Sequence, residues 1–318
     1  MKKYIAGMTA LVMLLVFVSA GAAIAEEKKL SVVTTIFPVY DWVREVVGEN
    51  DNAEITMLLD SGVDLHSYQP TAQDIMKVAT CDVFAYVGGE SDEWAEDALA
   101  ESVNPDMVVV NLLDALGDAV KEEEIVEGME AEEEEEEEAE YDEHVWLSLR
   151  NAQVLVKTLA DALGEADPAN AEGYAANADA YIEKLATLDG EYAAVVAAGD
   201  FDTLLFGDRF PFRYLADDYG LNYYAAFAGC SAETEASFET VAFLAGKVDE
   251  LGLTSVMTIE GTSHKIAETI VQSTQAKGAR ILALNSMQGT TAQDVAGGAT
   301  YLDVMEGNLE VLKEALAR

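Results

Sequence analysis

The sequence predicts an α/β protein of two lobes, each with a small parallel sheet flanked by helices, joined by a long backbone helix. Short β-branched segments alternate with helical segments on both sides of the middle of the chain, which favours parallel sheets covered on both faces. One helical pattern of unusual length, residues 167–198, separates the two series. The chain has 318 residues, 50% of them hydrophobic, which is enough for two cores of ordinary size.

The first lobe is predicted from a strand that feeds a helix. Residues 30–36 are rich in β-branched side chains, and Pro38 then opens a helix whose apolar face carries Val39, Trp42 and Val46. Further strands are predicted at 53–59, 83–87 and 107–111, with helices at 71–79 and 92–100. This alternation is typical of a parallel sheet, whose carboxyl edge is where ligands bind.

The middle of the chain predicts two helices in succession. The first covers residues 151–163, and the second starts with Asp167 at the N-cap and Pro168 at N1 and continues to about Val196. The second helix would span about 45 Å, enough to run along two stacked domains. The second lobe then follows, with strands at 203–206, 223–227, 255–259 and 281–284 and helices at 211–219, 238–251, 264–274 and 301–317.

The N-terminus predicts export. Met1-Lys2-Lys3 precedes an apolar stretch from Met8 to Ala23, and Ala23-Ile24-Ala25 forms a cleavage pattern before Glu26. The stretch is short for a membrane anchor. The sequence has no Cys near the cleavage point, so a lipid anchor is not expected. We therefore divide the chain into a signal peptide, an N-terminal lobe, a linking helix and a C-terminal lobe, at residues 1–25, 26–166, 167–198 and 199–318. The expected location is the periplasm or the extracytoplasmic face of the membrane.

The charge of the chain favours cations as partners. The formal net charge is -42, which excludes nucleic acid and anionic membrane surfaces because both require clustered Lys and Arg. An acidic low-complexity insert, residues 122–143, carries 15 of the 60 acidic residues and is expected to be solvated and largely disordered. Cys81 and Cys230 fall in different lobes, so we expect free thiols rather than a disulfide.

Three histidines are candidate metal ligands. His66 follows the second predicted strand, and His144 follows the acidic insert at another boundary between loop and helix. Two imidazoles from separate loops of one lobe could meet at a common edge and bind a transition metal, although two unrelated surface histidines would give the same spacing. His264 follows Glu260 by four residues, but Gly261 between them indicates a turn, so a surface position for His264 is the alternative.

Several segments resemble one family, the TroA-like (ZnuA-type) zinc and manganese solute-binding proteins of ABC transporters. The resemblance covers nearly the whole mature chain. It is carried by 33–41, Gly62 to Thr71 with its Gly-x-Asp-x-His-x-Tyr-x-Pro-Thr pattern, 85–90, His144-Val145-Trp146-Leu147-Ser148, 214–221 and 300–305.

The resemblance implies a metal ion between the lobes, with His66 and His144 as ligands from the N-terminal lobe. Zn²⁺ is the expected ion and Mn²⁺ the alternative, because imidazoles favour zinc and additional carboxylates favour manganese. The insert before the second histidine is Glu-rich here and His-rich in many relatives, which argues against a zinc-scavenging loop.

The C-terminal lobe departs from the family at two positions. Arg209 and Asn285 stand where relatives usually keep ligands. A guanidinium cannot bind a cation, so Arg209 is expected to pair with a carboxylate, and Asp64, Arg209 and Asn285 are expected to surround the ligands. Glu260 is the chosen third ligand, with His264 and Asp208 in reserve. Glu233, Glu235 and Cys230 are further candidates, and Cys230 could equally be a small core residue.

The resemblance implies a monomeric extracytoplasmic protein that captures the metal and delivers it to a cognate ABC permease with a separate ATPase. An exported metal buffer or adhesin that acts through the acidic insert is the alternative. A metallohydrolase is more remote, because the sequence has no His-Glu-x-x-His, Gly-x-Ser-x-Gly, paired Cys or Gly-rich phosphate motif. We therefore expect no enzyme activity.

Overall fold

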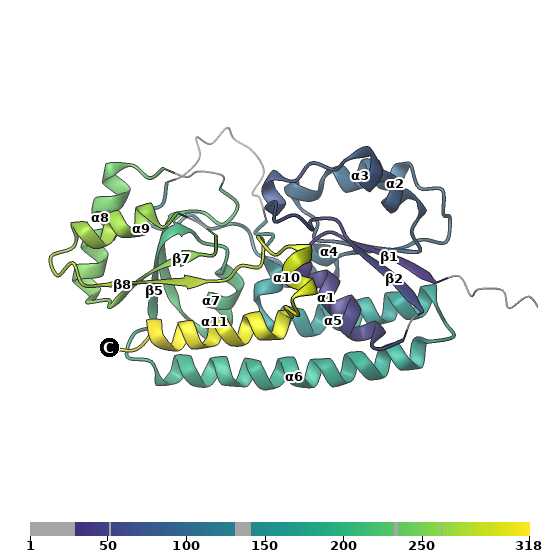
Figure 1. The fold of residues 1–318 in the computed structure, drawn as a ribbon. Coiled ribbons are helices and arrows are strands. Elements are labelled where there is room, and N and C mark those ends of the chain that lie inside the picture. Colours follow the sequence, from purple (N-terminus) through teal and green to yellow (C-terminus); the bar gives the residue numbers. More distant parts are fainter. Residues whose placement is uncertain (1–28, 51, 131–140, 232–234, 262) are drawn as a thin grey trace, which may run out of the picture.

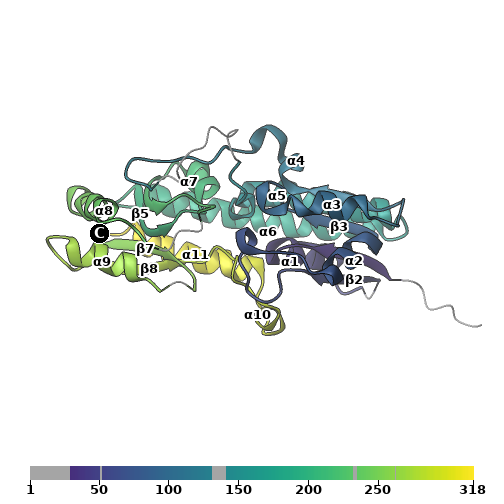
Figure 2. The same cartoon turned by 90° about the horizontal axis from the view of Figure 1, so that it is seen from above.

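The computed structural model describes residues 29–318 except 51, 131–140, 232–234 and 262. The described residues form two four-stranded sheets, and every strand pair in both is parallel. Figure 1 shows the sheets in two lobes above long helices, and Figure 2 shows that the lobes lie end to end. The predicted α/β architecture is thereby confirmed. The expected signal peptide, residues 1–25, lies outside the described residues.

The N-terminal sheet has the strand order β2-β1-β3-β4. Its strands are β1 (Leu30–Thr34), β2 (Ala53–Met57), β3 (Val83–Tyr86) and β4 (Val108–Asn111), and its helices are α1 (Phe37–Val47), α2 (Ala72–Thr80), α3 (Trp94–Ala100) and α4 (Leu112–Leu116). Pro38 lies in the first turn of α1, and a reciprocal capping box of Thr71 and Asp74 starts α2. Short 3-10 helices, among them η1 (Leu65–Ser67), η2 (Glu90–Asp92), η3 (Gly117–Ala119) and η4 (Val145–Leu147), lie in the loops.

The C-terminal sheet repeats this order as β6-β5-β7-β8. Its strands are β5 (Thr203–Arg209), β6 (Asn222–Phe227), β7 (Ser255–Ile259) and β8 (Arg280–Leu284), and its helices are α7 (Arg213–Tyr219), α8 (Phe238–Leu251), α9 (Lys265–Ser273), α10 (Ala292–Ala296) and α11 (Tyr301–Ala315). Helices α8 and α9 cover one face of the sheet and form a separate apolar cluster with Leu205, Ala226 and Val256. The register of β5 against β6 shifts between Phe206 and Arg209, an irregularity that changes the direction of the strand end.

Two helices in succession connect the lobes, α5 (Leu149–Ala166) and α6 (Ala171–Ala198). With 28 residues, α6 extends for about 42 Å. It starts after the predicted N-cap because Asp167 accepts hydrogen bonds from Asn170 Nδ2 at 2.7 Å and Tyr174 OH at 2.8 Å in the turn between the helices. Helix α6 packs against α1 and α5 toward one end and α7 and α11 toward the other.

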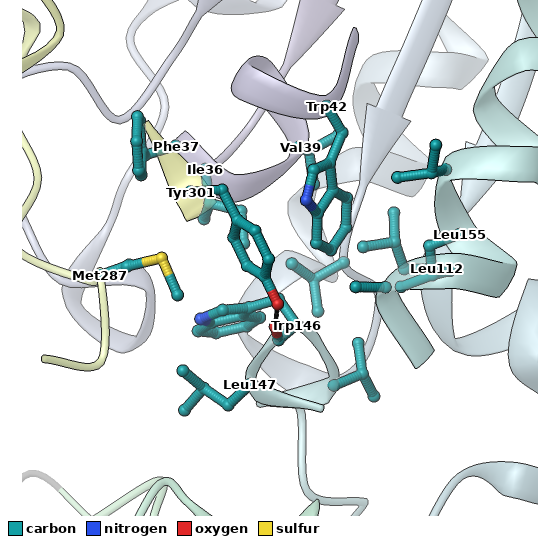
Figure 3. Packing of buried hydrophobic residues seen from close by; sticks show 14 of the residues in the cluster. Ile36, Phe37, Val39, Trp42, Leu112, Trp146, Leu147, Leu155, Met287 and Tyr301 are labelled. Carbon is teal, nitrogen blue, oxygen red and sulfur yellow. Dashed lines mark hydrogen bonds between the residues drawn. The ribbon is translucent and has the colours of Figure 1, made fainter. Parts of the chain in front are cut away.

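One hydrophobic core continues through both lobes. It contains Trp42 and Trp146 from the N-terminal part of the chain and Phe206 and Tyr301 from the C-terminal part, all almost fully buried. Trp146 Nε1 donates to the Ser286 carbonyl at 2.9 Å, and Tyr301 OH donates to the Trp146 carbonyl at 2.7 Å. Figure 3 shows Trp146 and Tyr301 packed together beside Trp42. The base of the space between the lobes is therefore filled with aromatic side chains.

The first part of the acidic insert, residues 122–130, is packed on the C-terminal lobe and is named here the acidic strap. Glu130 N donates to the Ala226 carbonyl at 3.0 Å, and Glu130 forms a parallel bridge with Phe227 at the end of β6. Glu124 accepts from Tyr223 OH at 3.0 Å and pairs with Arg213 at 3.4 Å. The expectation of a largely disordered insert is wrong for these residues, because their backbone and carboxylates have partners on the other lobe. Residues 131–140 lie outside the described part.

Two further expectations concern membranes and thiols. Across the described residues, no helix is both long enough and apolar enough to cross a membrane. Cys81 and Cys230 are free thiols, and the buried Sγ of Cys81 lies 3.2 Å from the Val78 carbonyl.

Candidate metal centre

His66 lies in η1, in the loop that follows β2. Asp64 precedes this turn and accepts a hydrogen bond from His66 N at 3.0 Å, which fixes the backbone. On the side chain, Nδ1 lies 2.8 Å from Ser91 Oγ, in the loop that follows β3. The loops that follow β2 and β3, the strands on either side of β1, therefore position this imidazole, with Nε2 pointing away from them.

His144 is held more tightly, by a single carboxylate. Asp142 Oδ1 accepts from both the backbone N and the ring Nδ1 of His144, each at 2.9 Å. Because Nδ1 carries the hydrogen in this arrangement, the lone pair of the neutral ring is on Nε2. The ring also lies against the Trp146 ring, with centroids 5.3 Å apart.

The two imidazoles face each other through Nε2, with 3.2 Å between these atoms. Two nitrogens bound to one tetrahedral zinc at about 2.0–2.1 Å lie about 3.3 Å apart, so the observed separation suits a shared ion. The side chains are 9% and 0% exposed, respectively. Burial, and after it the neighbouring His144 ring, lower the pKa of His66 to about 3. His66 is therefore neutral near neutral pH and has a lone pair to offer.

A thiol from the other lobe completes a group of three donors. A ligand atom of His66, of His144 and of Cys230 all lie within 4.8 Å of one another, the only such group of His, Cys, Asp and Glu among the described residues. Cys230 follows β6, and its backbone N donates to Glu123 of the acidic strap at 2.9 Å. Burial raises the pKa of the Cys230 thiol well above its ordinary value. The residues that come together are thus two imidazoles and one thiol.

The other candidates from the C-terminal lobe have different partners. Glu260 follows β7 and accepts from Ser286 N at 2.6 Å and Ser286 Oγ at 2.9 Å, so its carboxylate fixes the loop that follows β8. Asp208 accepts from Arg209 N at 3.0 Å and Ile259 N at 3.3 Å. Asn285 Oδ1 accepts from Met287 N at 2.8 Å. Each of these side chains accepts hydrogen bonds from nearby backbone N–H groups, and none of them belongs to the group of three donors.

The remaining candidates lie farther along the chain. His264 has a φ of 52° in the turn before α9 and is not part of the group of three donors. Glu235 is exposed, and Glu233 lies outside the described residues.

Arg209 connects the lobes at the site. Its guanidinium forms an ion pair with Asp64, the residue that holds the backbone of His66. Although burial alone would raise it, the pKa of Asp64 is held below its usual value by Arg209. Gln288 extends this contact: with its side-chain nitrogen facing Asp64, it donates to the two carboxylate oxygens at 3.0 and 3.2 Å.

Sequence reasoning missed Ser91, Asp142 and Gln288. A signal existed for Asp142, because Asp64-Leu65-His66 and Asp142-Glu143-His144 share an Asp-x-His spacing and both aspartates accept from the N–H of their histidine. Ser91 lies after the third strand, at the same sheet edge as His66. Gln288 had no comparable signal, since its position depends on the conformation of the loop after β8.

The fold and the site define a two-lobed α/β binding protein with nitrogen and sulfur donors between the lobes. The chain belongs to the family described as ZnuA, the periplasmic component A of zinc-uptake complexes, whose model matches residues 32–315.

Curated relatives include the high-affinity zinc uptake system protein ZnuA of Bacillus subtilis, 32% identical over 302 residues that cover 93% of this chain and 90% of the relative. The zinc-binding protein AdcA of Streptococcus pyogenes serotype M6 is 31% identical over 299 residues, 90% of this chain and 56% of the relative. The chain thus spans about half the length of the AdcA proteins it matches.

Solved structures are similar over nearly the same extent. The Zn(II)-bound ZnuA-like domain of Streptococcus pneumoniae AdcA has a TM-score of 0.71 and 30% identity, and covers 91% of this chain and 99% of that domain. The metal-dependent lipoprotein YcdH of Bacillus subtilis has a TM-score of 0.74 and 30% identity over the same shares.

Proposed function

We propose that this protein captures Zn²⁺ between its lobes outside the cytoplasm and delivers it to an ABC permease driven by a separate ATPase. One observation carries the proposal: the Nε2 atoms of His66 and His144 lie 3.2 Å apart while each Nδ1 has its own partner. Family membership and zinc-binding relatives support the choice of zinc over manganese.

The hydrogen bonding around the imidazoles suits metal capture. In a neutral pair at 3.2 Å, one Nε2 must carry a hydrogen, and Asp142 fixes the His144 hydrogen on Nδ1, so the hydrogen between the rings belongs to His66. Zinc takes the place of that hydrogen, which moves to Nδ1 of His66. Ser91 Oγ at 2.8 Å and Glu143 Oε2 at 3.5 Å can accept it there. Glu143 Oε2 is buried without a hydrogen-bond partner in the described structure, as such an acceptor would be.

The charge of the protein assists capture and does not determine where the ion binds. A net charge of -42 attracts divalent cations to the whole surface and raises the association rate at low ionic strength. Two preoriented imidazoles in a buried position then provide the nitrogen ligands that zinc prefers over solvated carboxylates.

Substitution of the histidines tests this function. We expect His66→Ala and His144→Ala each to weaken zinc binding by more than about 100-fold in competition titrations, since loss of a ligand should exceed the 10- to 100-fold effect of losing a supporting residue. His264→Ala is the matched control and should retain wild-type affinity. If both His66→Ala and His144→Ala bound zinc with wild-type affinity, the histidine pair would not be the zinc site.

The alternative of a metal buffer is tested by deleting residues 131–140. If the chain acts as a buffer through its insert, the deletion should abolish tight zinc binding while both histidines remain. If the histidine pair holds the ion, the deletion should leave the tight site intact and remove only weak binding.

Delivery is tested with the cognate permease and ATPase reconstituted in vesicles. We expect the wild-type protein to be a monomer in light scattering. When loaded with zinc, it should stimulate ATP hydrolysis and zinc uptake. The His144→Ala variant should do neither at the same zinc concentration. Equal stimulation by both proteins would contradict delivery from this site.

A further inference from the structure

We infer that Cys230 is the zinc ligand that the C-terminal lobe supplies, as a thiolate, so that the site selects borderline and soft divalent ions against Mn²⁺. The inference rests on the proposed function, because it assigns the third ligand of the same ion. Its first support is position: Cys230 is the donor from the second lobe that lies within 4.8 Å of a ligand atom of both histidines.

The competing donors of that lobe are committed elsewhere. Both carboxylate oxygens of Glu260 accept hydrogen bonds from Ser286, and Asn285 holds Met287 N. Arg209 carries a positive charge and pairs with Asp64, so its guanidinium is no ligand for the ion. Among the described His, Cys, Asp and Glu side chains of that lobe, Cys230 is the one whose ligand atom groups with those of both histidines.

The loop around Cys230 fits closely against the His144 ring. A Cβ built on Gly229 would lie 3.1 Å from Cε1 and 3.2 Å from Nδ1 of His144, and 2.9 Å from the Phe210 carbonyl. A larger residue at this position would push the loop away from the imidazoles. From the other side, Glu123 accepts from Cys230 N at 2.9 Å. The backbone on both sides of Sγ is therefore fixed next to His144.

Binding through Cys230 breaks the S–H bond and forms a Zn–S bond, and the thiol proton leaves to solvent. The thiolate contributes one negative charge, so the ion with two neutral imidazoles keeps a net charge of +1. Thiolate and imidazole ligands favour Zn²⁺, Co²⁺ and Cd²⁺, whereas Mn²⁺ prefers oxygen ligands. The identity of residue 230 thus determines which ions the site accepts.

Cobalt spectroscopy of the mature full-length chain tests the ligand directly. Co²⁺ bound to the wild type should show a thiolate-to-cobalt charge-transfer band in the near ultraviolet. Cys230→Ser should still bind Co²⁺ through the histidines but should lack the band. Cys81→Ala, which changes the other free thiol, should keep it, and circular dichroism of each variant checks folding.

Selectivity is the second readout. The ratio of the Mn²⁺ to the Zn²⁺ dissociation constant should fall by at least about tenfold in Cys230→Asp, since a carboxylate replaces the thiolate. A charge-transfer band that persists in Cys230→Ser, its absence from cobalt-loaded wild type, or an unchanged ratio in Cys230→Asp would overturn the thiolate ligand. These outcomes leave the histidine pair standing, whereas the proposed function itself fails if wild type binds neither Zn²⁺ nor Co²⁺.

Discussion

Asp41 illustrates what single residues contribute away from the metal centre. It lies on α1, is fully buried, and accepts a hydrogen bond from Tyr301 N at 2.7 Å across 260 positions of sequence. Burial raises the pKa of Asp41 to about 6, from an ordinary value of 3.8. Since the folded state binds this proton more tightly than the unfolded state, protonation of Asp41 stabilises the fold below the folded pKa.

The resulting pH dependence is testable with Asp41→Asn. The stabilisation is fully present below pH 3.8 and is lost as pH rises through about 6, so wild type should gain stability relative to the variant as pH falls from 6 to 4. The shift corresponds to about 3 kcal/mol at most. Urea unfolding at several pH values measures it. The control Asp179→Asn, at an exposed position of α6, should show the same pH dependence of the free energy of unfolding as the wild type. The same pH dependence in Asp41→Asn would contradict the raised pKa of Asp41.

Sequence could predict the part of the site that depends on strand ends and could not predict the part that depends on loop conformation. His66 and His144 follow from the sheet edge and from the family motifs around them. The sequence predicts Glu260 as a ligand because it is a carboxylate at a strand end, but the N–H and hydroxyl of Ser286 donate to its two oxygens. The sequence leaves Cys230 open between a ligand and a small core residue, and the structure places its thiol with the ligand atoms of His66 and His144.

At the scale of elements, the amino-acid composition of the acidic strap predicted its structure poorly. Its composition predicts solvated chain, and no local pattern indicates that Glu130 extends the C-terminal sheet or that Glu123 caps the loop of Cys230. These contacts depend on partners about a hundred residues away. The eight strands and the longer helices, by contrast, were predictable from periodicity, whereas the five-residue helices α4 and α10 were not predicted. Helix α6 begins a turn later than predicted because Asp167 accepts hydrogen bonds in the connecting loop.

Gly128 offers a way to detach the strap. Its φ is +87°, and a Cβ there would lie 2.1 Å from Phe243 Cδ1. Gly128→Ala should lower the free energy of unfolding by about 1–3 kcal/mol or release the strap from β6. Because Glu123 would then lose Cys230 N, zinc affinity should fall severalfold. Limited proteolysis and zinc titration measure the two effects. Gly307→Ala, where a Cβ meets nothing, is the control, and an equally resistant, equally tight-binding Gly128→Ala would contradict this role of the strap.

At the scale of the whole molecule, the shared core makes the two lobes one folding unit. Trp146, Tyr301 and the long helices connect both sheets, so we expect the two lobes to lose their packing together. All three tryptophans lie in the N-terminal part of the chain and Cys230 lies in the C-terminal part. The two kinds of residue therefore report separately on the two lobes.

We expect a single unfolding transition in urea. In a Cys81→Ala background without metal, the midpoint from tryptophan fluorescence should coincide with the midpoint from labelling of Cys230. Trp146→Phe removes the hydrogen bond to the Ser286 carbonyl, so both midpoints should shift together by about 1–3 kcal/mol of stability. Two separated midpoints would show that the lobes unfold independently.

The packing of Trp146 and Tyr301 beside His144 has a consequence for the rate of metal release. Trp146 lies against the imidazole, is almost fully buried and accepts a hydrogen bond from Tyr301 OH, so its ring closes that side of His144. We expect an ion to leave past the loops that follow β3, β6 and β8, which hold Ser91, Cys230 and Gln288 near the histidines. If those loops govern escape, the residence time of zinc reports on local loop opening rather than on hinge motion of whole lobes. A transporter that displaces only the loop of Cys230 would then release the zinc without separating the two lobes.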